Sequence, residues 1–423
     1  HPFLARTNRR TPQPRQHRRL TRDISPLAAA PYHSVYLGPN LGVMKTAKVD
    51  RSVYLDCAAS TPVRPEVLDA MLPYFTEHFG NPSGGHRMAR SSRTAIDDAR
   101  EICGHFLGFG PHEIVFTSGG TESDNLAIHG VCGADGVAIC PETEHHAVLH
   151  PVEFHNGRLV KVSSTGDIDL EHLETLLDEE VSVLSVMLVN NESGKIIDLE
   201  PIAELRDRHA PQAMLHTDAV QAINWIDLVD ASARADMLSI SGHKFGGPKG
   251  SGVLAVRNHV GLAPQLLGGG QEAERRSGTH NTAGIVAIGV ALQHLEKSRK
   301  SEIARLGILA ERLATSLKEA MPSCSETIPQ TERAAGLLQL VIEDIESEAL
   351  LVLLEREGVM ASAAASCASG AMDPSHVLAA MGMDRALAAG SLRLSLGWCT
   401  EEWEIEHAIE VIPRCVEQLR GES

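Results

Sequence analysis

The sequence predicts an α/β protein built on a mostly parallel sheet, followed by a smaller α+β region. From about residue 112 onward, short runs rich in valine, isoleucine and leucine alternate with helical patterns, which is typical of parallel strands joined by helices. After about residue 285, a long helical stretch leads into a few strands and a closing helix. The chain has 423 residues, more than one hydrophobic core usually spans, which favours two domains.

Seven apolar runs are the expected strands of the large sheet. Ligands gather at the carboxyl ends of parallel strands, and polar residues of interest follow several of these runs directly, so this edge is the predicted site. The expected strands are 113–117, 136–140, 159–162, 181–189, 214–218, 237–241 and 253–256.

The C-terminal region has the pattern of a smaller α+β domain. We place a large domain at 61–300 and the small domain at 301–423, and we expect residues 44–60 to pack on the small domain. Within the small domain we expect strands 337–342 and 392–396, with a helix near 346–357, a short strand after it, and a closing helix to about 419.

The first 43 residues differ in character from the rest of the chain. They carry seven arginines against the single acid Asp23 and show no helical or strand period, whereas periodic sequence begins soon after Met44. We expect a disordered or non-native extension, and a transit peptide is the less favoured alternative.

Bulk composition excludes several classes of function. The net charge is −17, which disfavours direct binding of nucleic acid and favours a protein partner. The chain has no apolar run of about eighteen residues, so no membrane span is expected. The eight cysteines form neither a Cys-x-x-Cys pair nor a regular framework, which predicts a reducing, cytoplasmic location and no metal site.

Lys244 is the most informative single residue. It lies in the run Ser-Gly-His-Lys-Phe-Gly-Gly, directly after an expected strand. A lysine reacts with a carbonyl compound when its amine is partly desolvated, and flanking glycines let the backbone approach a planar cofactor. Taken alone, such a run is more often a solvated loop lysine, and the other motifs of the chain favour the reactive one.

The run Thr117-Ser-Gly-Gly-Thr-Glu-Ser-Asp-Asn stands between an expected strand and an expected helix. Backbone N–H groups of Gly119, Gly120 and Thr121 at a helix N-terminus would bind a phosphate, and the Thr121 hydroxyl would add a donor. A simple helix cap with an acidic first turn is the alternative.

Three further runs place polar groups at strand ends. His145 is our choice for a ring that stacks on a planar cofactor, with His146 as a competing candidate. Asp218 would face a pyridine nitrogen and keep it protonated, although a helix cap is the alternative. Gln221 lies three residues further on, and the Asn190-Asn run offers an amide to the same site.

Together these runs resemble the cysteine desulfurases of the class V aminotransferase group, which are pyridoxal-phosphate enzymes of fold type I. The resemblance extends from Val53 to the last helix. It is carried by Gly80-Asn-Pro-Ser-Gly-Gly-His, Thr-Ser-Gly-Gly-Thr-Glu-Ser, Thr-Glu-His, Asn-Asn-Glu-x-Gly, His-Thr-Asp-Ala-Val-Gln, Ser-Gly-His-Lys and Arg276-Ser-Gly-Thr-His-Asn.

The resemblance implies a role for each matching residue. Lys244 would bind pyridoxal 5'-phosphate as a Schiff base, Asp218 would pair with its ring nitrogen, and His145 would stack on the ring. Asn191 and Gln221 would reach the phenolic oxygen. Phosphate contacts would come from Gly120, Thr121, Ser241 and His243, and from Thr279 of a second subunit, so a homodimer is implied.

Cys367 distinguishes a desulfurase from a transaminase. It lies in a run of small residues that is typical of an accessible loop, and Ser375 follows eight residues later, as in the family. The run Ala-Ser-Cys-Ala-Ser departs from the usual family pattern, which leaves the rigidity and partner preference of the loop open. Arg393 resembles the family arginine that binds the substrate carboxylate, with a surface strand arginine as the alternative.

The resemblance implies that L-cysteine is converted to L-alanine and that Cys367 receives the sulfur as a persulfide. Lys244 would remove the α proton and His145 would serve as a proton donor. An acceptor protein would then take the sulfur for iron–sulfur cluster assembly, tRNA thiolation or DNA sulfur modification. The alternatives are a selenocysteine lyase, an aminotransferase, a kynureninase-like hydrolase and a non-catalytic sulfur-relay scaffold.

Overall fold

The structure is a computed structural model that describes residues 52–133, 136–363 and 375–421. The described residues form one compact unit. The extension predicted for residues 1–43 and the predicted nucleophile Cys367 both lie outside the described residues.

The larger of the sheets has seven strands, as the sequence predicts. Neighbouring strands run parallel except at β8, which is antiparallel to both β2 and β7. This mostly parallel sheet confirms the predicted fold class. Its strands in spatial order are β2 (Ile114–Thr117), β8 (Gly252–Val256), β7 (Met237–Ser241), β6 (Met214–Asp218), β5 (Val181–Ser185), β3 (Val137–Pro141) and β4 (Arg158–Val160).

One expected strand is shorter than its apolar run. The run 181–189 predicts a single strand, but β5 ends at Ser185. The chain nevertheless continues beside β6, because the N–H groups of Val186 and Leu188 donate to the carbonyls of His216 and Asp218. Apolar composition therefore predicted the burial of this segment better than its strand end.

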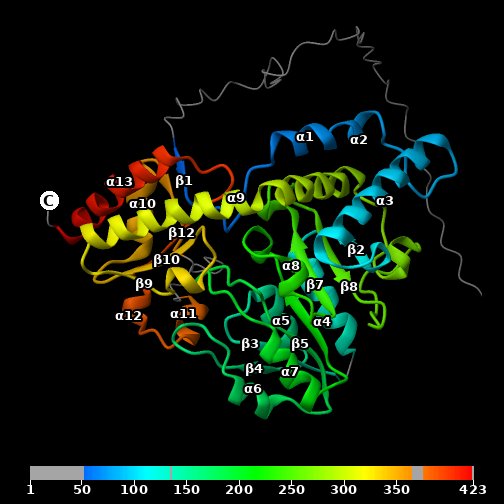
Figure 1. Ribbon diagram of the computed structural model, residues 1–423, viewed down its shortest axis with the longest axis horizontal. Coiled ribbons are helices and arrows are strands. Elements are labelled where there is room, and N and C mark those ends of the chain that lie inside the picture. Colours follow the sequence, from blue (N-terminus) through cyan, green and yellow to red (C-terminus); the bar gives the residue numbers. More distant parts are fainter. Residues whose placement is uncertain (1–51, 134–135, 364–374, 422–423) are drawn as a thin grey trace, which may run out of the picture. The chain divides into compact units, whose positions relative to one another are not determined.

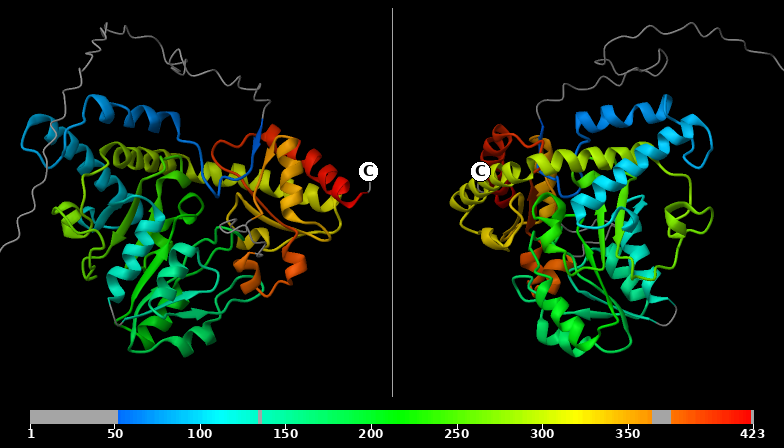
Figure 2. Two further views of the ribbon diagram at one scale, coloured as in Figure 1. Left: turned by 180° about the vertical axis from the view of Figure 1, so that it is seen from behind. Right: turned by 45° about the vertical axis from the view of Figure 1, so that its right-hand side comes forward.

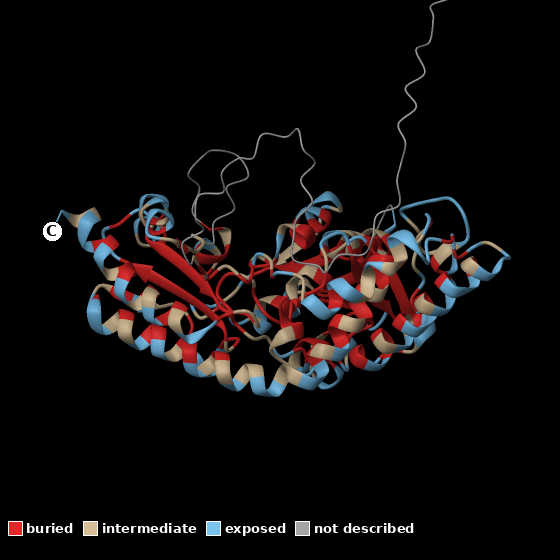
Figure 3. Ribbon diagram, turned by 90° about the horizontal axis from the view of Figure 1, so that it is seen from above, coloured by how far each residue is buried: buried red, intermediate tan, exposed pale blue. Residues whose placement is uncertain are grey.

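Helices cover both faces of the large sheet, and alternate side chains of each strand meet different helices. Val115 and Leu254 pack with α4 (Gly120–Cys132) and α5 (His146–Phe154) in one core. The residues directly before and after them on the same strands pack in a second core. This core contains α3 (Arg87–Leu107), α6 (Leu170–Leu176), α7 (Glu200–His209) and α9 (Thr282–Ala320). Figure 3 shows that most strand residues are buried and that the helices have exposed outer faces. A strand buried on both faces explains why these runs read as continuously apolar.

The C-terminal elements form a separate antiparallel sheet in the order β12 (Ser391–Ser395), β10 (Leu337–Ile342) and β9 (Cys324–Glu326). It shares a core with α10 (Ser347–Arg356) and α13 (Glu402–Arg420). Nearby, β1 (Val53–Tyr54) pairs in parallel with β11 (Val359–Met360). The remaining helices are α1 (Pro65–Met71), α2 (Pro73–Thr76), α8 (Leu228–Ala231), α11 (His376–Ala380) and α12 (Arg385–Ala388). No helix in the described ranges is long and apolar enough to cross a membrane.

Helix α9 connects the two sheets. Its first half, with Ile288 and Leu292, lies in the core of the large sheet, and its second half, with Leu313 and Leu317, lies in the core of the small sheet. Figures 1 and 2 show this single helix passing from one to the other. The expected division near residue 300 falls within α9, so the two sheets are held by a continuous helix and not by a linker.

Leu313→Ala should destabilise the protein by about 2–5 kcal/mol, because it opens a cavity in the core beneath the small sheet. Ile308→Ala is the matched control, since Ile308 lies on the same helix and is 71% exposed, and it should stay within about 0.5 kcal/mol of the parent. Urea unfolding measures both. Equal destabilisation by the two substitutions would contradict the assigned packing of α9.

Candidate active site

A cavity of about 460 Å³ opens at the carboxyl edge of the large sheet, which is within the range of small-molecule sites. It is lined by most of the predicted site residues, namely Gly120, Thr121, His145, Asn191, Asp218, Gln221, Ser241, His243, Lys244 and Arg393. Thr279 is exposed and does not line it. Cys367, in contrast, lies outside the described residues.

Lys244 enters the cavity from the turn that follows β7. Its Nζ donates to the carbonyl oxygens of Ala58 at 2.6 Å and Ala59 at 3.0 Å. The side-chain amide of Asn224 donates a hydrogen bond to the backbone carbonyl of Lys244, and the next residue, Phe245, is buried. Burial, and secondarily the charge of Arg393, lowers the pKa of Lys244 to about 8. The amine is therefore partly uncharged near neutral pH, as a nucleophile or base requires.

Asp218 ends β6 and is buried. One carboxylate oxygen accepts a hydrogen bond from the N–H of Val220 at 2.8 Å. The capping role given as the alternative therefore accounts for one of the two carboxylate oxygens. Burial raises the pKa of Asp218 to about 6, although the Val220 hydrogen bond and the charge of Lys244 lower it. A buried carboxylate in this state is stabilised by a cation placed against it.

The part of the cavity lining at the start of α4 is suited to an anion. Helix α4 begins here, and Gly119 precedes it with a φ of 153°, a conformation that side chains other than glycine rarely adopt. Gly252 lies so close that an added Cβ would stand 2.6 Å from the Cα of Gly119. Tight packing of two glycines thus sets the turn that leads into the first N–H groups of α4, beside the hydroxyls of Thr121 and Ser241.

His145 is neutral in this site, with its proton on Nε2. It caps α5, because its Nδ1 accepts a hydrogen bond from the N–H of Ala147 at 3.0 Å. Burial, and secondarily the charge of Lys244, lowers the pKa of His145 to about 4. A ring nitrogen that accepts a backbone N–H carries no proton, so Nε2 must be the donor. The competing candidate His146 also lines the cavity, with its ring 4.5 Å from that of His376.

Arg393 lies on β12 of the small sheet and points into the cavity that the large sheet provides. Its Nη2 pairs with Asp56 at 2.7 Å, and its Nη1 donates to the carbonyl of Asn191 at 3.0 Å. Among the described residues its Nε has no hydrogen-bond partner, although it is buried. Arg393 is therefore an inward-facing strand residue, unlike the surface arginine of the alternative interpretation.

Several residues around the cavity escaped the sequence analysis. Asp124 and Glu144 are buried acids beside Asp218, and burial, followed by the charge of Asp218, raises the pKa of each well above its usual value. Glu192 is a further buried acid, and its carboxylate accepts a hydrogen bond from Ser375, which caps α11 and which the sequence analysis named only for its spacing from Cys367. Asp124 lies within the predicted phosphate run and Glu144 directly precedes His145, so position in a motif was the available signal.

These residues fit pyridoxal phosphate. A helix N-terminus with two hydroxyls suits the phosphate, and the buried carboxylate of Asp218 suits a protonated ring nitrogen. The amine of Lys244 has only carbonyl partners among the described residues, so no carboxylate holds it away from a reacting aldehyde. Each end of the cofactor thus has a chemically matched partner in one cavity.

Residues 53–407 match the family model described as Aminotransferase class-V. The chain belongs to the class-V aminotransferase family. It is similar to "Cysteine desulfurase IscS" of Methanosarcina thermophila, with 39% identity over 383 residues, or 88% of this chain and 94% of the relative. Among solved structures, this class-V chain resembles "NIFS-LIKE PROTEIN", with a TM-score of 0.81, 31% identity, and coverage of 87% of this chain and 100% of that one. It also resembles "SspA in complex with cysteine", with a TM-score of 0.70, 32% identity, and coverage of 82% and 99%.

Lys244→Met should stabilise the cofactor-free protein at pH 7, because the folded state then no longer buries an ammonium group. In the parent, the pKa of Lys244 is about 8 when the chain is folded and 10.5 when the side chain is solvated in the unfolded chain. Below both values the buried charge costs about 3 kcal/mol. Between them the folded state has already released its proton, so the stability of the parent rises with pH.

Urea unfolding of both proteins at pH 7 and near pH 10.5 measures this difference. The gap between variant and parent should close as the pH rises. Lys300→Met, at an exposed position of α9, controls for the added apolar side chain. A gap of the same size at both pH values would refute the burial of the Lys244 charge.

Proposed function

We propose that this chain is a pyridoxal-phosphate-dependent cysteine desulfurase, which converts L-cysteine to L-alanine and retains the sulfur on Cys367. The observation that carries the proposal is the placement of Lys244, Asp218 and Arg393 around one cavity. The similarity of nearly the whole chain to proteins named cysteine desulfurase supports the same conclusion.

The chain's residues would hold the cofactor at its phosphate and at its aldehyde carbon. Gly120, Thr121, Ser241 and His243 would bind its phosphate, and Lys244 would bind its aldehyde carbon. When bound, pyridoxal phosphate supplies an electron sink for cleavage of bonds in an amino-acid substrate.

Three side chains complete the proposed contacts with the ring. Asp218 would pair with the ring nitrogen and His145 would stack on the ring face. Asn191 would reach the phenolic oxygen together with Gln221, whose Nε2 already donates to the carbonyl of Ala58 at 2.7 Å. A ring held on three sides is fixed in orientation relative to Lys244, which the chemistry requires.

Arg393 would bind the carboxylate of L-cysteine through its planar guanidinium. Asp56 now pairs with Nη2, so the substrate would share or displace this pair, and the unpartnered Nε offers a further donor. Asn191 is tied to the same guanidinium through its carbonyl. The contact between Arg393 and Asn191 would therefore link the substrate-binding residue to a cofactor-binding residue.

The proton steps follow from the protonation states of Lys244 and His145. The uncharged amine of Lys244 would remove the α proton of the substrate, and Nε2–H of His145 would return a proton to product. The Cys367 thiolate would attack the substrate sulfur. As the carbon–sulfur bond breaks, that sulfur would stay on Cys367 as a persulfide and L-alanine would leave.

Two partners complete the proposal. A second copy of this chain would contribute Thr279 to the phosphate site, which accords with an exposed Thr279 that does not line the cavity of its own subunit. An acceptor protein would take the sulfur from Cys367, and the net charge of −17 favours an acceptor with a basic docking surface.

Cys367→Ser should abolish sulfide production from L-cysteine with a reductant, by at least about 100-fold, because serine offers no thiolate. The visible absorbance of the bound cofactor should persist. Cys415→Ser, at a buried position in α13, is the matched control and should keep near-parent activity. Undiminished sulfide release by Cys367→Ser would show that another group accepts the sulfur.

Arg393→Lys should raise the KM for L-cysteine about tenfold or more, because an ammonium cannot donate in parallel to both oxygens of a carboxylate. Arg414→Lys is the control, since Arg414 lies half-exposed on α13 and pairs with Glu357. Steady-state alanine production at varied L-cysteine measures both. An unchanged KM in Arg393→Lys would exclude this residue as the carboxylate ligand.

A further inference from the structure

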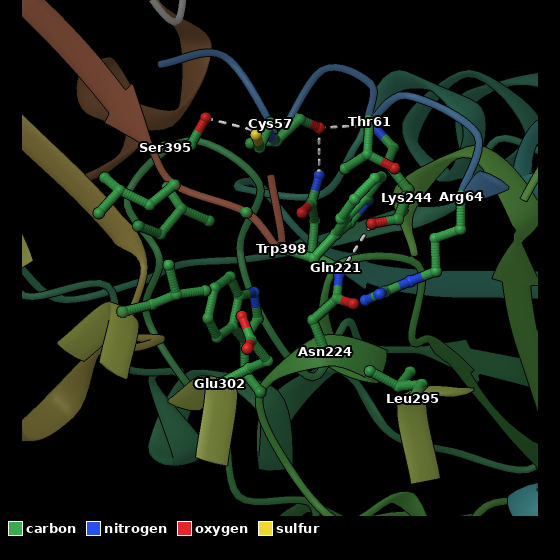
Figure 4. A pocket seen from close by; sticks show the side chains of 16 residues that line it. Cys57, Thr61, Arg64, Gln221, Asn224, Lys244, Leu295, Glu302, Ser395 and Trp398 are labelled. Atoms are coloured by element: carbon green, nitrogen blue, oxygen red, sulfur yellow. Dashed lines mark hydrogen bonds between the residues drawn. The ribbon is translucent and has the colours of Figure 1, made fainter. Parts of the chain in front are cut away.

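Two cysteines that lie far apart in the sequence meet beside the active site. Cys57 follows β1 and Cys399 follows β12, and their sulfur atoms are 3.9 Å apart. Cys57 lines a second, smaller pocket that also reaches Lys244 and Gln221. Figure 4 shows Cys57 in this pocket together with Arg64, Trp398 and Lys244.

The backbone is fixed on both sides of the pair. Cys57 donates its N–H to the carbonyl of Ser395 at 3.1 Å, and the N–H of Ala58 donates to the Ser395 hydroxyl at 2.8 Å. On the other side, Gly397 and Thr400 close a turn around Cys399, through Gly397 N–H to the Thr400 hydroxyl at 2.9 Å and Thr400 N–H to the Gly397 carbonyl at 2.9 Å. The thiols are thus presented to each other by two braced segments.

The two sulfur atoms must move closer before they can bond. A disulfide requires a separation of about 2 Å, so the sulfur atoms must approach by about another 2 Å. The sulfur of Cys57 rests against the Gly397 backbone, where an added Cβ would stand 2.7 Å away. Closure would therefore lift Cys57 from Gly397 and pull on the adjoining Ala58.

The two thiols differ in reactivity. Cys399 is partly exposed, whereas Cys57 is 5% exposed. The hydrogen bond from the Cys57 thiol lowers the pKa of Cys399, although burial opposes it, and the charge of Arg64 acts in the same direction as the hydrogen bond. Cys399 is therefore the thiol that an oxidant reaches first and the one that ionises more readily, with Cys57 as its neighbour.

We propose that Cys57 and Cys399 are an oxidation-sensitive dithiol, which hydroperoxides close to a disulfide beside Lys244. The Cys399 thiolate attacks the peroxide oxygen and becomes a sulfenic acid as the oxygen–oxygen bond breaks, and the hydroxide or alkoxide that leaves takes up a proton from solvent. The Cys57 sulfur then attacks the Cys399 sulfur, and its proton leaves with the hydroxyl as water. Disulfides in reducing compartments are mostly transient and redox-sensing, which suits such a switch.

The disulfide would act on Lys244 through Ala58 and Ala59. These residues follow Cys57 directly, and their carbonyls are the partners of the Lys244 amine. Gln221 also donates to the Ala58 carbonyl. Displacement of this segment would alter the hydrogen bonds that hold the Lys244 amine. The effect on activity rests on the proposed function, whereas formation of the disulfide is independent of it.

Peptide mapping tests the disulfide. The holoenzyme in the Cys367→Ser background is treated with limiting hydrogen peroxide, alkylated without reductant, digested and analysed by mass spectrometry. A linked pair of peptides containing Cys57 and Cys399 is expected, and reductant should separate them. Cys399→Ser should form no such link, whereas Cys132→Ser, at a buried position in α4, should form it like the parent.

Titration with L-alanine tests the consequence in the same proteins, with the cofactor absorbance as readout. Oxidation should weaken L-alanine binding at least about fivefold, with recovery on reduction, and Cys399→Ser should be insensitive. Sulfinic acid at Cys399 with Cys57 still alkylated would overturn the proposal, as would equal weakening by peroxide in Cys399→Ser. Failure of the holoenzyme to bind pyridoxal phosphate would instead refute the proposed function and leave the mapping result valid.

Discussion

The burial of the Lys244 amine without a carboxylate partner is the constraint on which the site depends. An ammonium group loses hydration when it is buried, and two carbonyl oxygens replace only part of it. The outcome is a pKa of about 8, low enough for the neutral amine to be accessible. A carboxylate at the position of Ala58 would have stabilised the charge and removed the reactivity.

The fold supplies this environment by joining segments that are distant in sequence. The carbonyls that hold Lys244 come from residues 58 and 59, which follow the strand that pairs with β11. Arg393 comes from the small sheet, and Asp56 ties it to the same N-terminal segment. Because α9 belongs to both cores, the small sheet cannot shift without disturbing the large one. Two independently packed cores therefore converge on one cavity.

Local sequence predicted the strand-end residues because each depends on a strand that can be recognised by its apolar run. Asp218 is the last residue of such a run, and Lys244 and His145 come shortly after one. Contacts between distant segments leave no comparable trace, so neither the carbonyls of Ala58 and Ala59 nor the pairing of Asp56 with Arg393 could be predicted. Arg393 was predicted only from its resemblance to the family arginine, because its flanking leucines would by themselves place it on the opposite side of the strand from the core.

Three buried carboxyl groups, from Asp218, Asp124 and Glu144, lie close enough for the charge of Asp218 to raise the pKa of the other two. They cannot all be ionised, since like charges in a poorly solvated region repel strongly. Burial raises the pKa of Asp218 to about 6, and the Val220 hydrogen bond and the charge of Lys244 oppose this shift. For Asp124 and Glu144, burial and the charge of Asp218 favour the protonated form. The fold thereby favours placing the negative charge on Asp218, where a protonated ring nitrogen could pair with it.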